Sequence, residues 1–443
     1  MVKNKTIMNN KILFRSLILI FLCVVKTNAQ EVLTLEDAVK IALENNYEIK
    51  IAANNLDIDK TNVAIGNAGM LPRVTADVVD NNSVQNTTQT RLDGTNISLD
   101  NAKNNNLNYG IALDWTIFDG LKMFAKYDQL KEFQKLGDTE LKQTIIQKVS
   151  DVNSIYFDLV QQQQNLSHLD STIVISQKRL TFTENRYTIG KGSKLDVLNA
   201  QVDLNTDLGN LIKQKQTYAN SKTLLNQVMA RELNADFIVT EAITVDNSLM
   251  LQELIDLAQK QNPELLLQII NKNITELQLK QIKGERYPVV KVNTGYNFND
   301  SQSSLGFNTQ SSAQGFNYGF TASLNLFDGN AQNRNEKIAK MQIENSTLMI
   351  NQQKVTLNSQ LTIAFQTYLA NIDLIKLKDD NVDIAKKNME ITAEKFKIGT
   401  ITSTEFRAAQ LNFINSKIRL SNAQFQAKLS EIGLKELAGN ISF

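Results

Sequence analysis

Residues 316–326 have the sequence Phe-Asn-Tyr-Gly-Phe-Thr-Ala-Ser-Leu-Asn-Leu, in which apolar or aromatic side chains alternate with small or polar ones. A period of two residues is that of a β-strand with one apolar face. At about eleven residues, the segment has the length that a tilted strand needs to cross a bilayer. The pattern therefore predicts a membrane strand whose lipid-facing side chains are Tyr318, Phe320, Leu324 and Leu326.

Other segments repeat this alternation. Residues 107–117 predict a second strand, and shorter alternating runs lie at 74–78 and 290–298. The segments 80–106 and 299–315 consist largely of Asn, Ser, Thr, Gln and Gly, which is typical of the external loops of membrane barrels. A soluble amphipathic hairpin would show the same alternation and is the alternative interpretation. On the second strand, the side chains expected to face lipid are Tyr109, Ile111, Leu113 and Trp115.

Two stretches of the chain are long and almost free of helix-breaking residues. Residues 121–188 contain one glycine and no proline, and residues 330–398 contain neither. Apolar side chains recur there at steps of three and four residues, as expected for a helix packed along its whole length. Helices of about 68 residues would extend on the order of 100 Å. After a short break, a second helix is predicted in each case, over 193–231 and 402–438, so that each pair forms an antiparallel hairpin.

The chain contains the same arrangement twice. Residues 33–74 match residues 249–290 without a gap, and Phe118-Asp119-Gly120 recurs as Phe327-Asp328-Gly329. Each copy is predicted to hold an amphipathic helix, two strands and a long helical hairpin. The predicted parts are a first repeat (30–232), a linker in the equatorial region (233–248) and a second repeat (249–443), with the amphipathic helices at 34–66 and 250–282.

The N-terminus has the features of a secretory signal peptide. Basic residues precede an apolar run from Leu17 to Val25, and Thr27-Asn28-Ala29 supplies the small residues of a cleavage site. The run is too short to be a membrane-spanning helix. Cys23 admits a lipoprotein as the alternative, although Leu22 is bulky where lipoprotein signals carry a small residue. We therefore expect residues 1–29 to be removed on export.

Composition excludes several classes of function. The chain has one histidine, His168, and one cysteine, which cannot build a zinc cluster or a Cys/His catalytic site. Lys and Arg number 47 against 46 Asp and Glu, so there is no basic field for binding nucleic acid. We expect no enzyme activity, no cofactor, no metal and no nucleic-acid partner.

The four predicted strands of one chain limit how the protein can assemble. A bilayer accepts strands only in a closed barrel, because an open edge leaves backbone N–H and C=O groups unpaired in hydrocarbon. About eight strands is the smallest practical barrel. Several copies must therefore share one barrel in outer-membrane lipid, with the helices continuing it as a hollow conduit. A secreted or surface coiled-coil protein, structural or adhesin-like, would use the same long helices and remains the alternative.

At this point the motifs show a family resemblance. The runs Leu33-Thr34-Leu35-Glu36-Asp37-Ala38, Leu71-Pro72 and Phe118-Asp119-Gly120, and the spacing of Arg186-Tyr187 with Gly190, Ser193 and Asp196, resemble the TolC outer-membrane efflux family. The resemblance implies a mainly α fold with transmembrane β-strands, in a homotrimer with a twelve-stranded barrel and a periplasmic α-helical barrel. It also implies a passive duct for tripartite efflux or type I secretion, working with a periplasmic adaptor protein and an inner-membrane transporter.

The resemblance places the turns at Gly190 and Gly399 at the periplasmic tip, where the conduit would open and close. Phe396 and Ile401 stand where the family has the tyrosine and arginine of its latch, so those latch bonds do not carry over. Capping boxes formed by Ser193 with Asp196 and by Thr402 with Glu405 are the alternative role for these residues. The candidate gate residues are Tyr187, Gly190, Ser193, Asp196, Phe396, Gly399, Thr402 and Glu405.

Overall fold

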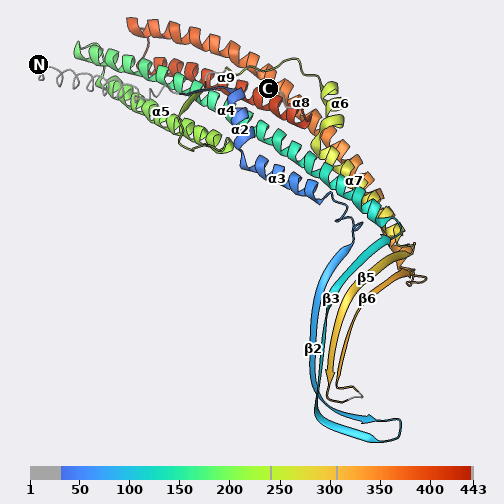
Figure 1. The fold of residues 1–443 in the computed structure, drawn as a ribbon. Helices are drawn as coiled ribbons and strands as arrows, with labels where there is room; N and C mark the ends of the chain where they lie inside the picture. Colours follow the sequence, from blue (N-terminus) through green and yellow to red (C-terminus); the bar gives the residue numbers. More distant parts are fainter. Residues whose placement is uncertain (1–30, 240–241, 306–307, 441–443) are drawn as a thin grey trace, which may run out of the picture.

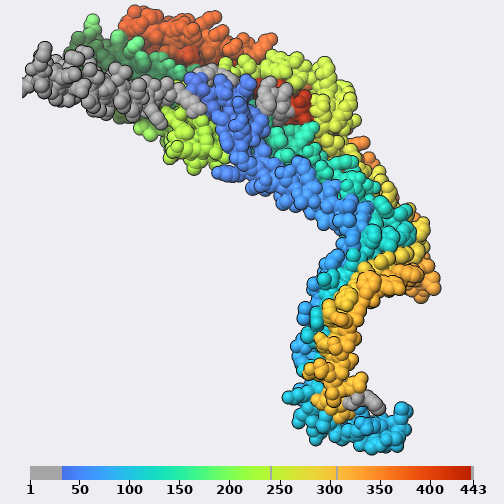
Figure 2. All heavy atoms as spheres, in the orientation of Figure 1, coloured from blue at the N-terminus to red at the C-terminus, as the bar shows by residue number. Residues whose placement is uncertain are grey.

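The computed structural model describes residues 31–440 except 240–241 and 306–307. The predicted signal peptide, residues 1–29, lies outside the described residues. Long helices form one arm of the molecule, and a narrow curved sheet continues from its end (Figure 1). In the space-filling view the helical arm is thick and the sheet is a thin ribbon (Figure 2).

The sheet contains four antiparallel strands, which are β2 (Arg73–Thr90), β3 (Asn96–Phe118), β5 (Val289–Ser303) and β6 (Gln310–Ser323). They lie in the order β2-β3-β5-β6, so that the two hairpins meet where β3 pairs with β5. Within the described residues, the outer edges of β2 and β6 have no strand partner.

The strands are longer than predicted, and the prediction of long loops at 80–106 and 299–315 is wrong. The β2–β3 hairpin extends to a short turn in which the backbone N–H of Thr95 donates to Asp93 Oδ1 at 3.0 Å. Polar side chains do not prevent pairing, because the ladder is made by backbone groups that each strand satisfies in its neighbour. A β-bulge between Gln85 and Thr87 interrupts the register, and the N–H of Asn101 donates there to Asn86 Oδ1 at 2.8 Å.

The strand predicted at 316–326 ends earlier than expected. Its last pair is Ser323 with Val289, so Leu324 and Leu326 lie beyond β6 and are not strand residues. Pro288 precedes Val289 and has no backbone N–H to extend the ladder. The prediction that Leu324 and Leu326 face lipid from a strand is therefore corrected.

The long helices agree with the sequence-based boundaries. The first hairpin consists of α4 (Lys122–Thr188) and α5 (Lys194–Val228), and the second of α8 (Ala331–Ile398) and α9 (Ser403–Leu437). The hairpins meet through α4 and α9, while α5 and α8 pack on their outer sides. No described helix is both long and apolar enough to cross a membrane.

Each predicted amphipathic helix is in fact two helices. The first half has α2 (Leu35–Asn45) and α3 (Tyr47–Asn62), and the second has α6 (Leu251–Gln261) and α7 (Pro263–Gly284). An asparagine makes each break, since Asn46 Oδ1 accepts from the N–H of Glu48 at 2.8 Å and Asn262 Oδ1 from that of Leu265 at 3.0 Å. Such N-caps begin a new helix with non-helical backbone at the cap.

The hydrophobic core lies midway along the helical arm. Strand β1 (Glu31–Leu33) pairs in parallel with β4 (Phe237–Val239), which belongs to the segment predicted as a linker. Fully buried Tyr156 packs in this core and donates from its hydroxyl to the carbonyl of Leu33 at 2.9 Å. A second cluster contains Tyr368 on α8, so each long hairpin is fixed at its middle.

Candidate functional site

One face of the sheet is apolar across all four strands. Tyr109 on β3 lies between Val78 and Phe298, and its ring stacks on Phe298 with centroids 4.8 Å apart. On β6, Tyr318 is 81% exposed and Phe320 is 77% exposed. Apolar surface of this extent on a thin sheet requires a partner other than water. The predicted lipid-facing residues on this face are Tyr109, Ile111, Leu113, Trp115, Tyr318 and Phe320.

The opposite face is small and polar. Gly110 lies opposite Asn297, whose side chain donates to Asn317 Oδ1 at 3.2 Å, and Asn293 donates to Asp114. A Cβ on Gly110 would lie 2.6 Å from the carbonyl oxygen of Tyr296, so only glycine fits at this position. The sheet is thus two-faced, with one side suited to lipid and the other to water.

The Phe-Asp-Gly motif joins the sheet to the long helices. Asp119 Oδ1 accepts from the N–H of Met123 at 3.2 Å, and Asp328 Oδ2 accepts from the N–H of Gln332 at 2.7 Å. These carboxylates satisfy first-turn N–H groups that the helices cannot pair internally. Nearby, the indole Nε1 of Trp115 donates to the carbonyl of Met70 at 2.9 Å, which gives the ring a polar anchor at the base of the sheet.

The far ends of the long helices form two glycine turns. Gly190 has φ +70° and Gly399 has φ +81°, the left-handed conformation that ends a helix. Behind each turn the chain closes with an N–H donated back to the helix, from Lys191 to Arg186 O at 2.8 Å and from Thr400 to Lys395 O at 3.0 Å. The predicted turns are therefore present at one end of the molecule.

The two returning helices begin differently. Thr402 and Glu405 form the predicted capping box, with Thr402 N–H donating to Glu405 Oε2 at 2.8 Å and Glu405 N–H to Thr402 Oγ1 at 3.2 Å. The backbone N–H of Thr402 lowers the pKa of the Glu405 carboxyl. The capping box predicted for Ser193 with Asp196 is wrong, because Ser193 Oγ accepts from the N–H of Leu195 at 3.1 Å instead. A box needs the N–H three residues on.

A pocket of about 480 Å³ separates the two glycine turns. Phe396 closes one side, where it is buried and stacks on Phe406 with centroids 5.0 Å apart. Tyr187, Gly399 and Glu405 do not line the pocket, and the ring centroid of Tyr187 lies instead 5.3 Å from Lys194 Nζ. Of the predicted gate residues, the pocket brings together Gly190, Ser193, Asp196, Phe396 and Thr402, together with Arg186.

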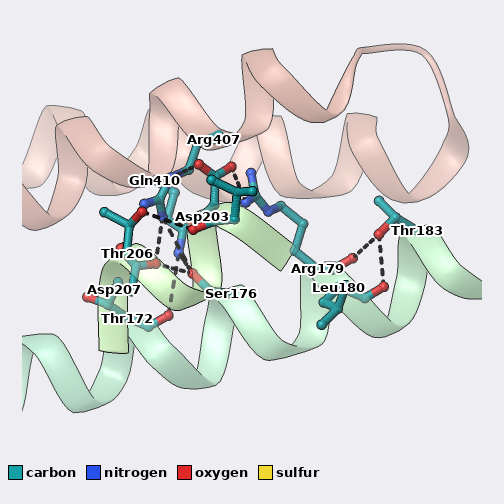
Figure 3. Close-up of polar contacts among 11 residues, drawn as sticks. Thr172, Ser176, Arg179, Leu180, Thr183, Asp203, Thr206, Asp207, Arg407 and Gln410 are labelled. Carbon is teal, nitrogen blue, oxygen red and sulfur yellow. Dashed lines mark hydrogen bonds and ion pairs between the residues drawn. The ribbon is translucent and has the colours of Figure 1, made fainter. Parts of the chain in front are cut away.

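A buried ionic network lies just behind this pocket, and sequence reasoning missed it (Figure 3). The guanidinium of Arg407 on α9 binds both carboxylate oxygens of Asp207 on α5 at 2.7 Å. Ser176 on α4 donates to Asp207 Oδ2 at 2.6 Å, and Arg179 on α4 pairs with Asp203. Gln410 on α9 donates to Ser176 Oγ at 2.8 Å.

The only signal for this network in the sequence is spacing. Asp203 and Asp207 are four residues apart, and Arg407 and Gln410 three apart, so each pair shares one helix face. Leu204 lies beside this face and belongs to an apolar cluster between α4 and α5. The charged residues Asp203 and Asp207 could have been singled out because they adjoin the apolar residue Leu204. The sequence around them does not indicate that Arg407 is the partner of Asp207.

Comparison with known proteins covers most of the chain. The model of the outer membrane efflux protein family matches residues 38–231 and 254–440. The chain belongs to this family. Its localisation in the outer membrane of a Gram-negative bacterium is thereby confirmed, as is the TolC-like resemblance. The relatives that this chain resembles are outer-membrane channel proteins and not enzymes.

Individual relatives are distant but extensive. Outer membrane protein TolC of Vibrio cholerae is 20% identical over 322 residues, which cover 72% of this chain and 74% of that protein. Proteases secretion protein PrtF of Dickeya chrysanthemi is 19% identical over 411 residues, covering 92% and 88%. The outer-membrane channel OprN superimposes with a TM-score of 0.75 at 14% identity, covering 92% of this chain and 90% of that one. The Campylobacter jejuni CmeC outer membrane channel gives 0.73 at 15%, covering 91% and 85%. The mainly helical fold with its sheet is shared with these channels.

Proposed function

We propose that three copies of the chain assemble into a passive duct, the outer-membrane channel of a tripartite efflux or type I secretion system. The observation that carries this proposal is the open, two-faced sheet. Its order is β2-β3-β5-β6, one face is apolar, and the outer edges of β2 and β6 have no partner among the described residues. In lipid such edges would leave a row of backbone groups without hydrogen bonds.

If copies of the same chain join edge to edge into a closed barrel, the outer strands β2 and β6 gain hydrogen-bond partners. Three copies of a four-stranded sheet give twelve strands, above the minimum of about eight for a barrel. The small polar face with Gly110, Asn297 and Asn317 would then line a water-filled lumen, and the face with Tyr109 and Tyr318 would meet lipid.

Helix α8 supports the same assembly. Met341, Leu348 and Val355 are seven residues apart and 51%, 59% and 71% exposed. The spacing resumes near the tip, where the exposed side chains are Leu377, Ile384, Ile391 and Ile398. Apolar residues repeated every seven positions form the seam of a coiled coil, and this seam faces solvent in the single chain. We place α5 of the next copy against it, because α5 and α8 occupy the two outer sides of the helical arm.

The remaining parts of the system are inferred from the family. PrtF is described as a proteases secretion protein and TolC as an outer membrane protein. By analogy, a periplasmic adaptor would meet the helical tip and an inner-membrane transporter would supply the energy. The duct itself needs only to open and close at the tip, where Asp196 faces the pocket between the two turns.

The test is expression with the leader in a Gram-negative host, followed by membrane fractionation and electrophoresis without boiling. We expect the protein in the outer membrane, migrating at about three times the mass of one chain, and forming channels in planar bilayers. A water-soluble single chain with no conductance would contradict the proposal and favour the secreted coiled-coil alternative.

A further inference from the structure

Phe396 lines two pockets, the one between the glycine turns and a second one among α4, α8 and α9. The second pocket has a volume of about 320 Å³. Its lining is mainly apolar and includes three phenylalanine rings in contact with one another. Phe396 stacks on Phe406 and is tilted against Phe182, with ring centroids 5.0 Å apart in both contacts. A cavity of this size with apolar and aromatic walls is typical of a small-molecule site.

The charged groups at the second pocket are all positive. Lys178, Arg179 and Lys397 line it, and none of the described residues that line it is acidic. Lys397 is neutralised by Glu394, whose Oε1 lies 2.6 Å from its Nζ. Lys178 is exposed and forms no hydrogen bond or ion pair with the described part of the chain. Lys178 therefore leaves a positive charge uncompensated at the pocket.

Arg179 adds hydrogen-bond donors that the protein does not use. It is 2% exposed, and within the described residues its guanidinium bonds only the Asp203 carboxylate. Its Nε is buried and has no acceptor among those residues. A guanidinium carries five N–H donors, and leaving one unpaired away from water costs free energy. A ligand that brings an acceptor to this wall of the pocket would remove that cost.

The balance of charge favours a ligand with a single negative charge. In the network behind the pocket, the guanidinium groups of Arg179 and Arg407 are matched by the carboxylates of Asp203 and Asp207. The charge of Lys178 is the one left over, so a monoanion would neutralise the site. A carboxylate has two oxygens, which suits donors on two neighbouring side chains.

We propose that this pocket binds an aromatic monocarboxylate, with its rings against the three phenylalanines and its carboxylate between Lys178 and Arg179. Offset or edge-to-face packing on those rings favours an aromatic body over an aliphatic chain. Residues of one chain form the whole site, so the binding goes beyond the proposed channel function and does not depend on it.

The pocket does not coincide with the surface assigned to the next copy of the chain. On α8 it uses Met389, Ala393 and Phe396, which are four and three residues apart and share one helix face. The exposed seam of α8 includes Ile384 and Ile391. At about 100° per residue, the seam lies on roughly the opposite side of the helix. Contact along the seam would therefore not cover the α8 side of the ligand site.

The experiment is equilibrium dialysis of naphthoate against the purified full-length protein in detergent, with protein-free micelles as the blank. We expect saturable binding of one naphthoate per chain. Neutral naphthylmethanol and cationic naphthylmethylamine have the same rings, but neither brings a negative charge to Lys178. Both should therefore bind at least about tenfold more weakly than naphthoate.

Three variants locate the binding. Lys178→Gln removes the uncompensated charge, so it should weaken naphthoate binding about tenfold and leave naphthylmethanol binding unchanged. Ala393→Phe fills the pocket and should abolish the binding of both. Lys142→Gln, the same change at an exposed position of α4 outside the pocket, should bind naphthoate as the wild type does. Melting temperatures identify the variants that are folded.

Wild-type affinity for naphthoate in folded Lys178→Gln would overturn the proposal, as would the absence of saturable binding to the wild-type protein. Equal affinities for the acid, the alcohol and the amine would also overturn it, because they would show only partition onto apolar surface. If Ala393→Phe did not fold, the comparison of Lys178→Gln with Lys142→Gln would still decide. A protein that binds naphthoate but forms no channels in planar bilayers would refute the proposed function and leave the ligand site standing, which separates the two outcomes.

Discussion

Asn46 and Asn262 occupy equivalent places in the two halves and do two jobs each. Besides capping α3 and α7, Asn46 Nδ2 donates to the carbonyl of Val228 at 2.8 Å, and Asn262 Nδ2 donates to that of Leu437 at 3.0 Å. Each amide thus joins a short helix to the end of a returning long helix. Asparagine carries an acceptor and two donors on one short side chain, which suits it to both contacts at each site.

This double role predicts a graded loss of stability. Asn46→Ala removes the cap and the bond to Val228 and should destabilise the protein by about 2 kcal/mol. Asn46→Asp keeps the acceptor but loses the donor, so its loss should be smaller. Thermal dissociation of the trimer on unboiled gels measures both. Asn55→Ala, at an exposed position of α3, is the control and should change little. Equal loss in all three variants would refute the double role.

Glu405 predicts a pH effect at the start of α9. Its pKa is lowered by the N–H of Thr402, so the charged form is favoured in the folded state. The cap therefore contributes fully above the ordinary glutamate pKa of about 4.3 and is lost as pH falls through the lower folded value. Hydrogen exchange of residues 402–406, corrected for intrinsic rates, should show protection falling on acidification, first at the N–H of Thr402, which binds the Glu405 carboxylate. Glu405→Gln should remove this dependence, and an identical acid profile in that variant would exclude Glu405 as its source.

At the scale of elements, the long helices were predicted well, whereas the breaks in the short helices and the lengths of the strands were not. The ends of α4 and α8 could be placed because Gly190 and Gly399 are unambiguous stop signals. The strands were underestimated because residues 80–90 and 96–106 are polar, and alternation reports only the part of a strand with an apolar face. The Arg407–Asp207 pair was missed because it joins residues 200 positions apart. Local patterns carry no information on such pairing.

The junctions after β3 and β6 offer a matched test of the Phe-Asp-Gly motif. Gly120 and Gly329 both have positive φ, at +74° and +66°. A Cβ at Gly120 would clash with the backbone of Gly284, whereas a Cβ at Gly329 would meet nothing within 4 Å. Gly329→Ala should therefore cost only the left-handed strain, about 1 kcal/mol, and Gly120→Ala clearly more. Trimer dissociation temperature measures the difference, and equal costs would show that α7 does not constrain the junction.

For the molecule as a whole, the described residues leave two more surfaces uncovered besides the apolar face of the sheet. One is the row of backbone groups along β2 and β6, and the other is the heptad seam of α8. The strand edges run along the sheet and the seam runs along the helical arm, and within the described residues the two long hairpins are each fixed at their middle by a buried cluster. The association proposed above would cover both at once, so the strand count and the helix seam favour the same proposed assembly.

The seam predicts which substitution prevents assembly. Val355→Glu places a charge in the middle of the apolar row, where an adjacent helix would bury it, and burying an unpaired charge is strongly unfavourable. Trimer yield should fall at least about tenfold, and because the sheet cannot then close, outer-membrane recovery should fall with it. Gln360→Glu, exposed on a different face of α8, should assemble normally. A full yield of Val355→Glu trimers would show that α8 faces water in the assembly, and the copies would then have to meet through other helices.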